Sequence, residues 1–394
     1  MKKKIDLIIL CGGRGLRLKK ITEKISKPMI KFGNVSFLRH IINFYKKYNF
    51  ENIYLLAGYK GEQILKEFNE SFENSTAIRC FIEKEPLGTG GAIKNIKNKI
   101  KNDFVLVNGD SFLNLNFSKF LNFKNNSNFM AKMILVKNLN YKSNRKLSSL
   151  SIDVNNTLKF NYKSNLMNSG IYFFKKKSLK YFSKKKFSLE NDLLPKLIKQ
   201  KKIIAYQEKN FFIDIGTKKQ LISAKKKLKK YFYKPGLFLD RDGVLNKDTG
   251  YVYKYKDFKW LPGSIKAIKF AQSKFHIFIV TNQSGIGRGY YSLEQFNILH
   301  KKIKTHLCSK NIFINDLEFC PHHPVQAKGK YKFKCDCRKP NIGMIKNLKK
   351  KWYINFKKSI FIGDKKSDQE AAKKSKIKFF YKKKNLFNSI KKYI

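Results

Sequence analysis

The chain has 394 residues, of which 42% are hydrophobic and 14% aromatic, enough for two or three packed domains rather than one. Its formal net charge is +59, with 86 Lys and Arg residues against 27 Asp and Glu residues. Only eight of these cations are Arg, and the Lys residues are spread over the whole length, whereas nucleic-acid binders cluster cations on one face. The charge therefore indicates a broad compositional bias, and we expect no specific nucleic-acid partner.

A membrane-spanning segment is not expected, because no run of 18 uncharged apolar residues occurs. The basic start Met1–Lys4 and the short apolar run Ile5–Leu10 do not make a signal peptide, since the run carries Asp6 and leads into a Gly-rich loop. We expect a cytoplasmic protein without a membrane partner. The six cysteines do not form a disulfide framework, because three cluster near His322 and the others are scattered.

The order of apolar runs predicts an α/β fold in two domains. In the first half, strand-like runs alternate with amphipathic, helix-like stretches such as 35–48, which is typical of a mostly parallel sheet. A helix is expected over 218–230, after which Lys234-Pro235-Gly236 breaks the chain and a second βαβ series begins. The predicted domains are 1–232 and 233–394. The strands expected in the first domain are 5–10, 52–56, 104–107 and 131–136.

The first candidate site is a Gly-rich loop that follows the first predicted strand. Gly12, Gly13 and Gly15 allow backbone N–H groups to approach a phosphate chain closely, and Arg17 adds a bidentate donor. Lys27 offers a second cation. The loop has neither the Gly-x-Gly-x-x-Gly spacing of dinucleotide binders nor the ending of a P-loop. A tight strand-to-helix turn without a ligand is the alternative.

Further motifs in the first domain favour a phosphate site. The loop 85–92 is a second segment with exposed backbone, and Asp110 follows a buried strand. Asn168 lies in Asn-Ser-Gly-Ile-Tyr, and Asp214 lies in the segment 212–217. Asp110 and Asp214 are candidates to share one Mg²⁺, which prefers carboxylate oxygens and usually keeps waters and substrate phosphates as its other ligands.

These motifs resemble the sugar-phosphate nucleotidyltransferase family over residues 5–225, and within it the guanylyltransferases of D-glycero-D-manno-heptose 1-phosphate. The resemblance implies a Rossmann-like (GT-A-like) domain that binds a nucleoside triphosphate and a sugar 1-phosphate. Many relatives have Pro where this chain has Ser26, which leaves the neighbouring lysine in place. The implied roles are triphosphate binding by Gly12, Gly13, Gly15 and Arg17, charge neutralisation during transfer by Lys27, contact with the base or ribose by Gly88 and Thr89, Mg²⁺ binding by Asp110 and Asp214, and sugar contact by Asn168 and Glu190.

The second half contains four polar clusters. Three of them directly follow a strand-like apolar run, and the fourth, Arg338-Lys339, lies between the second and the third of these runs. They are Asp240-Arg241-Asp242-Gly243, Thr281-Asn282-Gln283, Arg338-Lys339 and Gly363-Asp364. Ligands of open α/β sheets bind at the carboxyl ends of strands, so these clusters predict a phosphate and magnesium site. An isolated Asp-x-Asp is often a solvated turn, but four clusters in this order favour phosphoryl chemistry.

The chemistry assigns a role to each group at this predicted site. Asp240 is the candidate nucleophile that forms an aspartyl-phosphate, and Asp242 is the candidate acid and base. Thr281 and Lys339 are expected to hold phosphoryl oxygens. The expected Mg²⁺ ligands are Asp240, Asp242 and Asp364.

A Cys-x-His and a Cys-x-Cys pair predict a structural zinc site. Cys320, His322, Cys335 and Cys337 together supply three thiolates and one imidazole, which suits tetrahedral Zn²⁺ with no open position. The metal is expected to pin the loop that delivers Arg338 and Lys339. Free buried thiols are the alternative.

Residues 236–380 resemble the haloacid-dehalogenase superfamily, specifically the phosphatases that remove the 7-phosphate of D-glycero-D-manno-heptose 1,7-bisphosphate. The segment 248–251, with Asp248 and Tyr251, belongs to the matching motifs. The resemblance implies a Rossmannoid fold with a zinc-binding loop, substrate contacts from Asp248, Tyr251, Asn282 and Arg338, and Arg338 as the substrate-selecting cation. Val244 replaces a Thr found in many relatives, which changes packing more than chemistry. Histidinol-phosphate phosphatases share the Asp-x-Asp and zinc patterns and are the rival within this domain.

The two resemblances together imply one bifunctional enzyme. The phosphatase product, heptose 1-phosphate, is what the nucleotidyltransferase would activate, giving a nucleotide-heptose (GDP-heptose in the first instance) for a lipopolysaccharide, capsule or S-layer glycan. Mg²⁺ in both domains and structural Zn²⁺ are the implied cofactors. One alternative is a nucleotidyltransferase for another sugar 1-phosphate, fused to a histidinol-phosphate-phosphatase-like domain. Another is a basic nucleic-acid-binding protein with vestigial sites.

Overall fold

The structure is a computed structural model that describes residues 4–18, 20–69, 72–73, 76–124, 128–137, 150–161 and 163–393. The chain forms two compact units. Unit 1 comprises Met1–Ile30, Phe50–Phe72 and Thr76–Lys226, and unit 2 comprises Lys31–Asn49, Glu73–Ser75 and Lys227–Ile394. The division between units 1 and 2 at Lys226 lies close to the border at 232 that the sequence predicts, but unit 2 also takes in a segment from the first half of the chain. The domain border itself stays a prediction.

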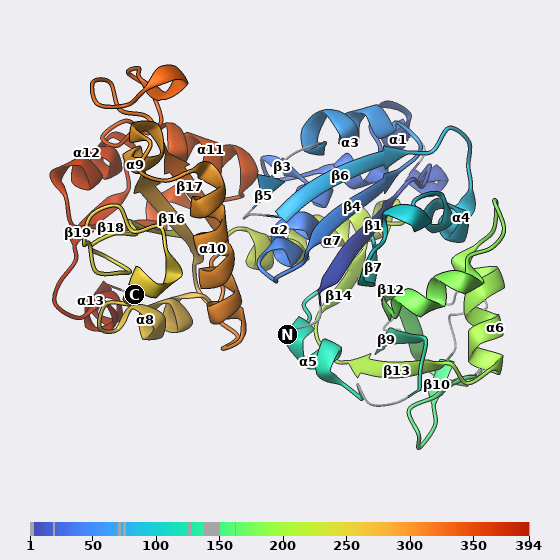
Figure 1. The fold of residues 1–394 in the computed structure, drawn as a ribbon. Helices are drawn as coiled ribbons and strands as arrows, with labels where there is room; N and C mark the ends of the chain where they lie inside the picture. The colour runs from blue at the N-terminus through green and yellow to red at the C-terminus, as the bar shows by residue number, and fades with distance from the viewer. Residues whose placement is uncertain are drawn as a thin grey trace. The chain divides into compact units, whose positions relative to one another are not determined.

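Unit 1 contains one large mixed sheet, ten-stranded within the described residues, with helices packed on it (Figure 1). Its strands are β1 (Ile5–Cys11), β4 (Asn52–Ala57), β5 (Phe72–Glu73), β6 (Thr76–Ile82), β7 (Asp103–Asn108), β9 (Ala131–Lys137), β10 (Leu150–Ile152), β11 (Leu158–Phe160), β12 (Leu166–Phe174) and β13 (Ile203–Glu208), and a separate pair joins β8 (Ser111–Leu113) to β14 (Phe212–Asp214). Its helices are α1 (Lys20–Lys24), α3 (Gly61–Phe68), α4 (Gly88–Asn95), α5 (Phe117–Asn122), α6 (Leu194–Lys199) and α7 (Lys218–Phe232), whose last turns pass into unit 2.

The centre of this sheet is parallel and fully buried. Strand β1 pairs in parallel with β4 on one side and β7 on the other, and β12 joins antiparallel to β7. Buried parallel strands are near-continuous apolar runs, as in Leu7-Ile8-Ile9 of β1. The carboxyl ends of β1 and β7 lie side by side, since Leu10 is in register with Asn108. The Gly-rich loop and Asp110 therefore follow neighbouring strands, and the parallel α/β fold expected for this half is confirmed.

Unit 2 contains a five-stranded parallel sheet with helices on both faces (Figure 1). The strand order is β17-β16-β15-β18-β19. The strands are β15 (Gly236–Leu239), β16 (His276–Asn282), β17 (Asp316–Cys320), β18 (Ile360–Gly363) and β19 (Lys378–Tyr381), the helices are α8 (Ser264–Ala271), α9 (Ser284–Arg288), α10 (Leu293–Cys308), α11 (Gly343–Lys351), α12 (Lys366–Lys374) and α13 (Leu386–Tyr393), and the segment from the first half adds β2 (Lys31–Phe32), β3 (Val35–Ser36) and α2 (Phe37–Lys46).

Alternating side chains of β15 build two separate cores. Leu237 and Leu239 pack with residues of α8, α10 and α13 on one face, whereas Phe238 packs with residues of α11 and α12 on the other. Successive strand residues point to opposite faces, so a run that is apolar at every position needs helices on both sides. This is the doubly covered α/β arrangement that the sequence predicts.

A buried ion pair ties α2 into unit 2. Nζ of Lys46 lies 2.7 Å from Oδ2 of Asp316, and both side chains are at most 2% exposed. The indole Nε1 of Trp352 donates to the same oxygen at 2.7 Å. Removing one partner of such a pair leaves an uncompensated buried charge, so the segment is a structural part of unit 2.

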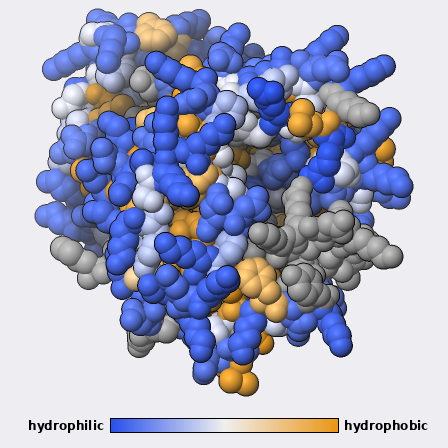
Figure 2. All heavy atoms as spheres, turned by 90° about the vertical axis from the view of Figure 1, so that its right-hand side faces the viewer, coloured by the Kyte–Doolittle hydropathy of each residue, from blue (hydrophilic) through white to orange (hydrophobic). Residues whose placement is uncertain are grey.

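The surface reflects the lysine-rich composition. The face drawn in Figure 2 is mostly hydrophilic, and its apolar side chains stand in small separate groups. Among the helices that the structure describes, none has the length and apolarity needed to cross a membrane.

Candidate active sites

The first site is a cavity of about 500 Å³ at the carboxyl ends of the strands of unit 1. The Gly-rich loop contributes Gly12 and Gly13. Gly88 and Thr89 also line the cavity, but they begin helix α4, so the segment 85–92 that we expected as a loop is helical from Gly88 on. Asp110 also lines the cavity. The structure thus brings together three parts of the chain that the sequence singled out separately. The other residues that line it, for which the sequence indicated no individual role, are Leu10, Arg14, Leu56, Gly58, Tyr59, Glu83, Lys84, Glu85, Pro86, Ala92 and Asn108.

Lys27 and Asp110 form the charged centre of this site. The Lys27 ammonium lies 2.5 Å from Oδ2 of Asp110, and the Ser111 hydroxyl donates to Oδ1 at 3.1 Å. Burial acts to raise the pKa of Asp110, but the Lys27 charge and these hydrogen bonds outweigh it and hold the pKa below its usual value. Asp110 is therefore an anionic oxygen ligand next to a cation.

Asp214 approaches Asp110 through the β8–β14 pair, in which Asp214 is in register with Ser111. Burial raises the pKa of Asp214, as does the neighbouring charge of Asp110, while Lys27 and Arg17 act in the opposite direction. A carboxylate whose proton affinity is raised by a neighbouring carboxylate suits a hard cation such as Mg²⁺.

The expected sugar contacts lie in two different environments. Thr89 donates its hydroxyl hydrogen to Oε2 of Glu190 at 2.6 Å, so Glu190 lies directly beside a residue that lines the cavity. Asn168 instead donates to the Tyr172 hydroxyl within β12 and accepts from the Gly170 N–H. Gly15, Arg17, Lys27 and Asn168 are not among the residues that line the cavity.

One carboxylate of this cavity was missed in the sequence. Glu83 follows β6 by one residue, and its Oε2 accepts from the Leu87 N–H at 3.3 Å. Its Oε1 lies so close to two loops that a Cβ on Gly58 would come within 2.5 Å of it and one on Gly12 within 3.0 Å. Burial raises the pKa of Glu83. The strand-end position was a signal that could have identified it.

The second site is a cavity of about 420 Å³ at the carboxyl ends of β15, β16 and β18 in unit 2. Residues of three of the four predicted clusters line it. The fourth cluster, Gly363-Asp364, does not line it, but a carboxylate oxygen of Asp364 lies within 4.8 Å of one of Asp240. The residues that line it are Asp240, Asp242, Asp248, Gly250, Tyr251, Thr281, Asn282, Gln283, Ser284, Gly285, Tyr291, Arg338, Lys339, Lys365, Ser367 and Asp368.

A buried lysine holds the carboxylates of this site together. Nζ of Lys339 lies 3.0 Å from Asp240 and 2.6 Å from Asp368, and it also donates to the Val280 carbonyl at 2.7 Å. Burial raises the pKa of Asp240 to about 6, against the opposing effect of Lys339 and with further help from the Asp368 charge. A nucleophilic carboxylate must be ionised, and additional positive charge at this site would favour that form.

Asp240, Asp364 and Asp368 each offer one carboxylate oxygen, and these three oxygens lie within 4.8 Å of one another. Oxygen ligands at such spacing fit Mg²⁺. Asp368 was not predicted, although it lies one helical turn after Asp364 in sequence. Asp242, which we expected as a third ligand, is not part of this cluster in the described residues.

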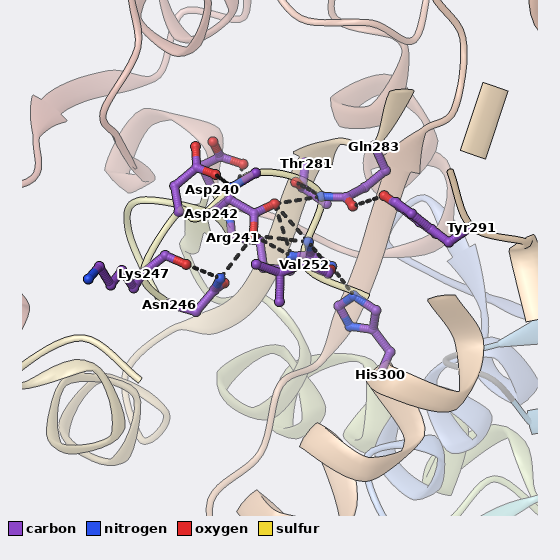
Figure 3. Close-up of polar contacts among 12 residues, drawn as sticks. Asp240, Arg241, Asp242, Asn246, Lys247, Val252, Thr281, Gln283, Tyr291 and His300 are labelled. Carbon is purple, nitrogen blue, oxygen red and sulfur yellow. Dashed lines mark hydrogen bonds and ion pairs between the residues drawn. The ribbon is translucent and has the colours of Figure 1, made fainter. Parts of the chain in front are cut away.

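Asp242 is held instead by its own neighbour in sequence (Figure 3). The guanidinium of Arg241 donates to both oxygens of Asp242 at 2.8–3.1 Å, and Arg241 is fully buried. Asn246 and Gln283 each donate to Asp242 as well, at 2.9 and 2.8 Å. Three side chains thus fix the orientation of the candidate acid and base, and the sequence motif alone does not reveal these contacts.

The residues that we expect to bind substrate lie near these carboxylates. The Thr281 hydroxyl accepts from Gln283 at 2.8 Å, and the Asn282 side chain exchanges hydrogen bonds with the backbone of Lys339 at 3.0 and 3.1 Å. Asp248 pairs with Lys365 at 3.1 Å. The polar cluster at the end of β16 therefore meets the Arg338-Lys339 segment.

The four predicted zinc ligands converge. Their ligand atoms lie within 4.8 Å of one another, with sulfur–sulfur distances of 3.1–3.5 Å. These distances are longer than the S–S bond of a disulfide. Four ligand atoms at such separations suit the corners of a tetrahedron around one metal ion. Arg338 donates to the His322 carbonyl at 3.1 Å, so the cluster is coupled to the cation that lines the cavity. The cluster members are Cys320, His322, Cys335 and Cys337.

Comparison with known proteins agrees with this geometry. A family profile described as "Nucleotidyl transferase" matches residues 6–231, and one described as "Polynucleotide kinase 3 phosphatase" matches residues 238–387. The D-glycero-beta-D-manno-heptose-1,7-bisphosphate 7-phosphatase of Photorhabdus laumondii subsp. laumondii is 40% identical over 144 residues, which cover 36% of this chain and 77% of that protein. The alpha-specific enzyme of the same organism is 41% identical over 141 residues, with 36% and 77% covered.

A solved structure also matches the first part of the chain. The crystal structure of HddC from Yersinia pseudotuberculosis is 31% identical, with a TM-score of 0.47, and covers 57% of this chain and 99% of that chain. The chain belongs to the nucleotidyl transferase family over its first part and to the heptose-bisphosphate phosphatase family over its last part. The prediction of a fusion of these two families is confirmed.

The two sites predict separable losses of activity. Asp240→Asn removes the nucleophile and should reduce phosphate release from a phosphorylated sugar by roughly 10³-fold or more, while sparing nucleotidyl transfer. Asp110→Asn removes an anionic metal ligand and should reduce nucleotidyl transfer by roughly 10²-fold or more, while sparing phosphate release. Both activities are measured on each purified variant. Loss of both activities in either folded variant would contradict two independent sites.

Removal of zinc should destabilise unit 2. Both tryptophans of the chain, Trp260 and Trp352, lie in unit 2, so their fluorescence reports its unfolding alone. Chelation should lower the melting temperature read from this fluorescence by about 5–10 °C, because metal binding energy contributes to folding. Added Zn²⁺ should restore it. An unchanged melting temperature after metal analysis has verified zinc removal would exclude a structural zinc.

Proposed function

We propose that this protein is a bifunctional enzyme of nucleotide-activated heptose synthesis. The phosphatase domain removes the 7-phosphate of D-glycero-D-manno-heptose 1,7-bisphosphate, and the nucleotidyltransferase domain joins the resulting heptose 1-phosphate to GMP from GTP. The observation that carries the proposal is that one chain contains two such sites. One is a cavity with aspartates and a lysine in a domain related to heptose-bisphosphate phosphatases, and the other is a cavity lined by the Gly-rich loop of the nucleotidyltransferase domain. The domains concerned are 1–232 and 233–394.

In the phosphatase, Asp240 attacks the phosphorus of the 7-phosphate and forms an aspartyl-phosphate. Asp242, held by Arg241, gives a proton to the leaving C7 oxygen and then takes one from the water that hydrolyses the intermediate. Lys339 and the Thr281 hydroxyl hold phosphoryl oxygens. Inorganic phosphate and heptose 1-phosphate leave, and Asp240 is regenerated.

Magnesium fits both sites by the chemistry of their donors. Asp240, Asp364 and Asp368 would hold it in the phosphatase, and Asp110 with Asp214 would hold it in the nucleotidyltransferase. When bound, it neutralises phosphate charge and lowers the repulsion between anionic groups. The raised pKa of Asp240 is consistent with a site that binds an additional cation.

In the nucleotidyltransferase, an oxygen of heptose 1-phosphate attacks the α-phosphorus of the nucleoside triphosphate, and pyrophosphate leaves. No covalent protein intermediate is required, so the protein contributes by positioning and by charge neutralisation. The backbone of Gly12 and Gly13 faces the cavity, and Lys27 supplies a cation beside Asp110. Arg17 and Gly15 act on the triphosphate, and Asn168 and Glu190 act on the sugar.

Glu83 supports guanine as the base. A carboxylate only accepts hydrogen bonds, and the guanine edge presents two adjacent donors, N1–H and N2–H₂. Adenine, cytosine and uracil each place an acceptor next to their donor. A carboxylate that lines the cavity, close to the backbone of Gly12 and Gly58, therefore matches guanine best.

The proposal is tested by measuring each half-reaction separately. Both anomers of heptose 1,7-bisphosphate are offered for phosphate release, and both anomers of heptose 1-phosphate are offered with each nucleoside triphosphate for pyrophosphate release. The expected result is activity on one matching anomer in both assays, with GTP preferred. Activity only on another sugar 1-phosphate would reassign the first domain, and hydrolysis of histidinol phosphate but not of heptose bisphosphate would reassign the second. We place this synthesis in the cytoplasm, where nucleoside triphosphates and reduced thiols occur.

Glu83→Gln should change the choice of nucleotide. The amide turns one acceptor into a donor, which opposes a donor of guanine, so kcat/KM with GTP should fall about 10–100-fold, chiefly through KM. The relative use of UTP should rise. Glu62→Gln, which removes an exposed carboxylate in α3 outside the cavity, is the matched control. If GTP preference is the same in Glu83→Gln as in the wild type, guanine is read elsewhere.

A further inference from the structure

A buried histidine of α10 contacts the arginine that holds the candidate acid and base of the phosphatase. Nε2 of His300 lies 3.3 Å from Nη1 of Arg241, and Arg241 in turn binds Asp242 (Figure 3). Arg241 is fully buried, His300 is 7% exposed, and neither is among the residues that line the cavity. Asp242 does line it, so His300 and Arg241 act on the reaction only through that carboxyl group.

The contact between His300 and Arg241 has a defined direction. A guanidinium donates hydrogen bonds and accepts none, so Nε2 of His300 is the acceptor and carries no proton. The single ring proton of the neutral imidazole is then on Nδ1. Burial, together with the Arg241 charge, holds the pKa of His300 well below its ordinary value, which keeps the ring neutral. His300 therefore presents one fixed acceptor to the guanidinium.

Hydrogen bonds on two sides fix the guanidinium of Arg241. Its Nε and Nη2 donate to Asp242 at 2.8–3.1 Å, and Nη2 also donates to the Val252 carbonyl at 2.9 Å. Among the described residues, His300 is the hydrogen-bond partner of Nη1. The ring of Phe296 covers the group, with its centre 5.8 Å from the guanidinium carbon. Without His300 a buried donor would lose its partner, and the guanidinium would gain by turning toward another acceptor.

Packing alone does not account for a histidine at this position. The His300 ring lines a small cavity of about 30 Å³ together with mostly apolar side chains, among them Ile279, Ile303 and Leu317. A leucine would suit such surroundings, whereas burying an imidazole is costly unless it is hydrogen-bonded. The hydrogen bond with Arg241 offsets that cost and gives the imidazole a role that an apolar side chain lacks.

We propose that His300 is a positioning residue of the phosphatase, which accepts a hydrogen bond from Arg241 and so fixes the guanidinium that aims the Asp242 carboxyl group at the leaving oxygen. The inference rests on the proposed function, in which Asp242 gives a proton to that oxygen. His300 touches no substrate and exchanges no proton in the reaction. Its replacement should weaken proton donation and leave the attack by Asp240 in place.

The test compares two leaving groups in the full-length protein. The sugar alkoxide of heptose 1,7-bisphosphate needs a proton in order to leave, whereas the phenolate of p-nitrophenyl phosphate leaves without one. His300→Leu should lower kcat/KM about 10–100-fold for the heptose bisphosphate and less than about 3-fold for the aryl phosphate. His300→Gln keeps an acceptor, the amide oxygen, and should stay within about 3-fold of the wild type on both substrates.

His306→Leu is the matched control, because it removes another imidazole from the same helix. The His306 ring stacks near Trp260, with 6.2 Å between the ring centres, and its Nε2 has no hydrogen-bond partner among the described residues. This variant should keep the wild-type ratio between the two substrates. Equal losses on both substrates in His300→Leu would mean a merely structural role and overturn the proposal, as would no loss on either.

The tautomer of His300 gives a second, independent readout. Nitrogen-15 NMR of histidine-labelled protein, with the His300 signals assigned from their absence in His300→Gln, should show a bare Nε2 and a protonated Nδ1. A proton on Nε2 would overturn the proposed contact. If the wild type hydrolyses another sugar phosphate but not heptose bisphosphate, the proposed sugar is wrong, and the ratio measured with that sugar phosphate decides on His300. A wild type that hydrolyses no phosphate ester would refute both.

Discussion

Both sites depend on a lysine ammonium held against carboxylates at the ends of buried strands. In unit 2, Lys339 is 3% exposed and lies between Asp240 and Asp368, which are 5% and 0% exposed. Two carboxylates at this depth repel each other and lose their hydration, and the lysine charge offsets part of both costs. In unit 1, Lys27 pairs with a single carboxylate, that of Asp110, whose side chain is 35% exposed. In each site the lysine therefore favours the ionised state of the neighbouring carboxylate.

This constraint explains why the catalytic groups come from segments far apart in the chain. The carboxyl ends of parallel strands lie together at one edge of the sheet. Carboxylates and lysines from distant segments can meet there in a common cavity. Lys339 reaches that edge from an irregular loop, whose course is fixed by Asn282 on one side and by the Cys and His cluster on the other. The cluster of thiols and imidazole thus acts on the active site through the position of the loop.

The sequence predicted these sites where the signal was a polar cluster at the end of an apolar run. That pattern located Asp110, Asp240 and Thr281, because strand ends are visible in the sequence of a parallel sheet. It could not reveal Asp368, which reaches the site from helix α12. The sequence does not show where this helix begins, and therefore not which of its residues face the site. Glu83 stands one residue beyond a strand and was within reach of the same argument.

Tertiary contacts account for the other differences. Arg241 occupies the spacer of the Asp-x-Asp motif, where alternation would point it away from Asp242, yet its long side chain turns back to hold that carboxylate. Lys46 resembles any of the 78 lysines in sequence, and only the fold shows that it is buried against Asp316 in unit 2. In a chain with this composition, burial rather than residue type distinguishes a structural cation from a solvated one.

The central claim is that the two domains act in sequence on one sugar, and ³¹P NMR of the wild-type protein with heptose 1,7-bisphosphate, GTP and Mg²⁺ tests it most directly. The account predicts that inorganic phosphate and heptose 1-phosphate appear first, and that pyrophosphate and a nucleotide-heptose without a 7-phosphate follow. Release of pyrophosphate before inorganic phosphate, with a nucleotide-heptose that still carries its 7-phosphate, would contradict this order. Phosphate release that never leads to a nucleotide-heptose would contradict the joint function.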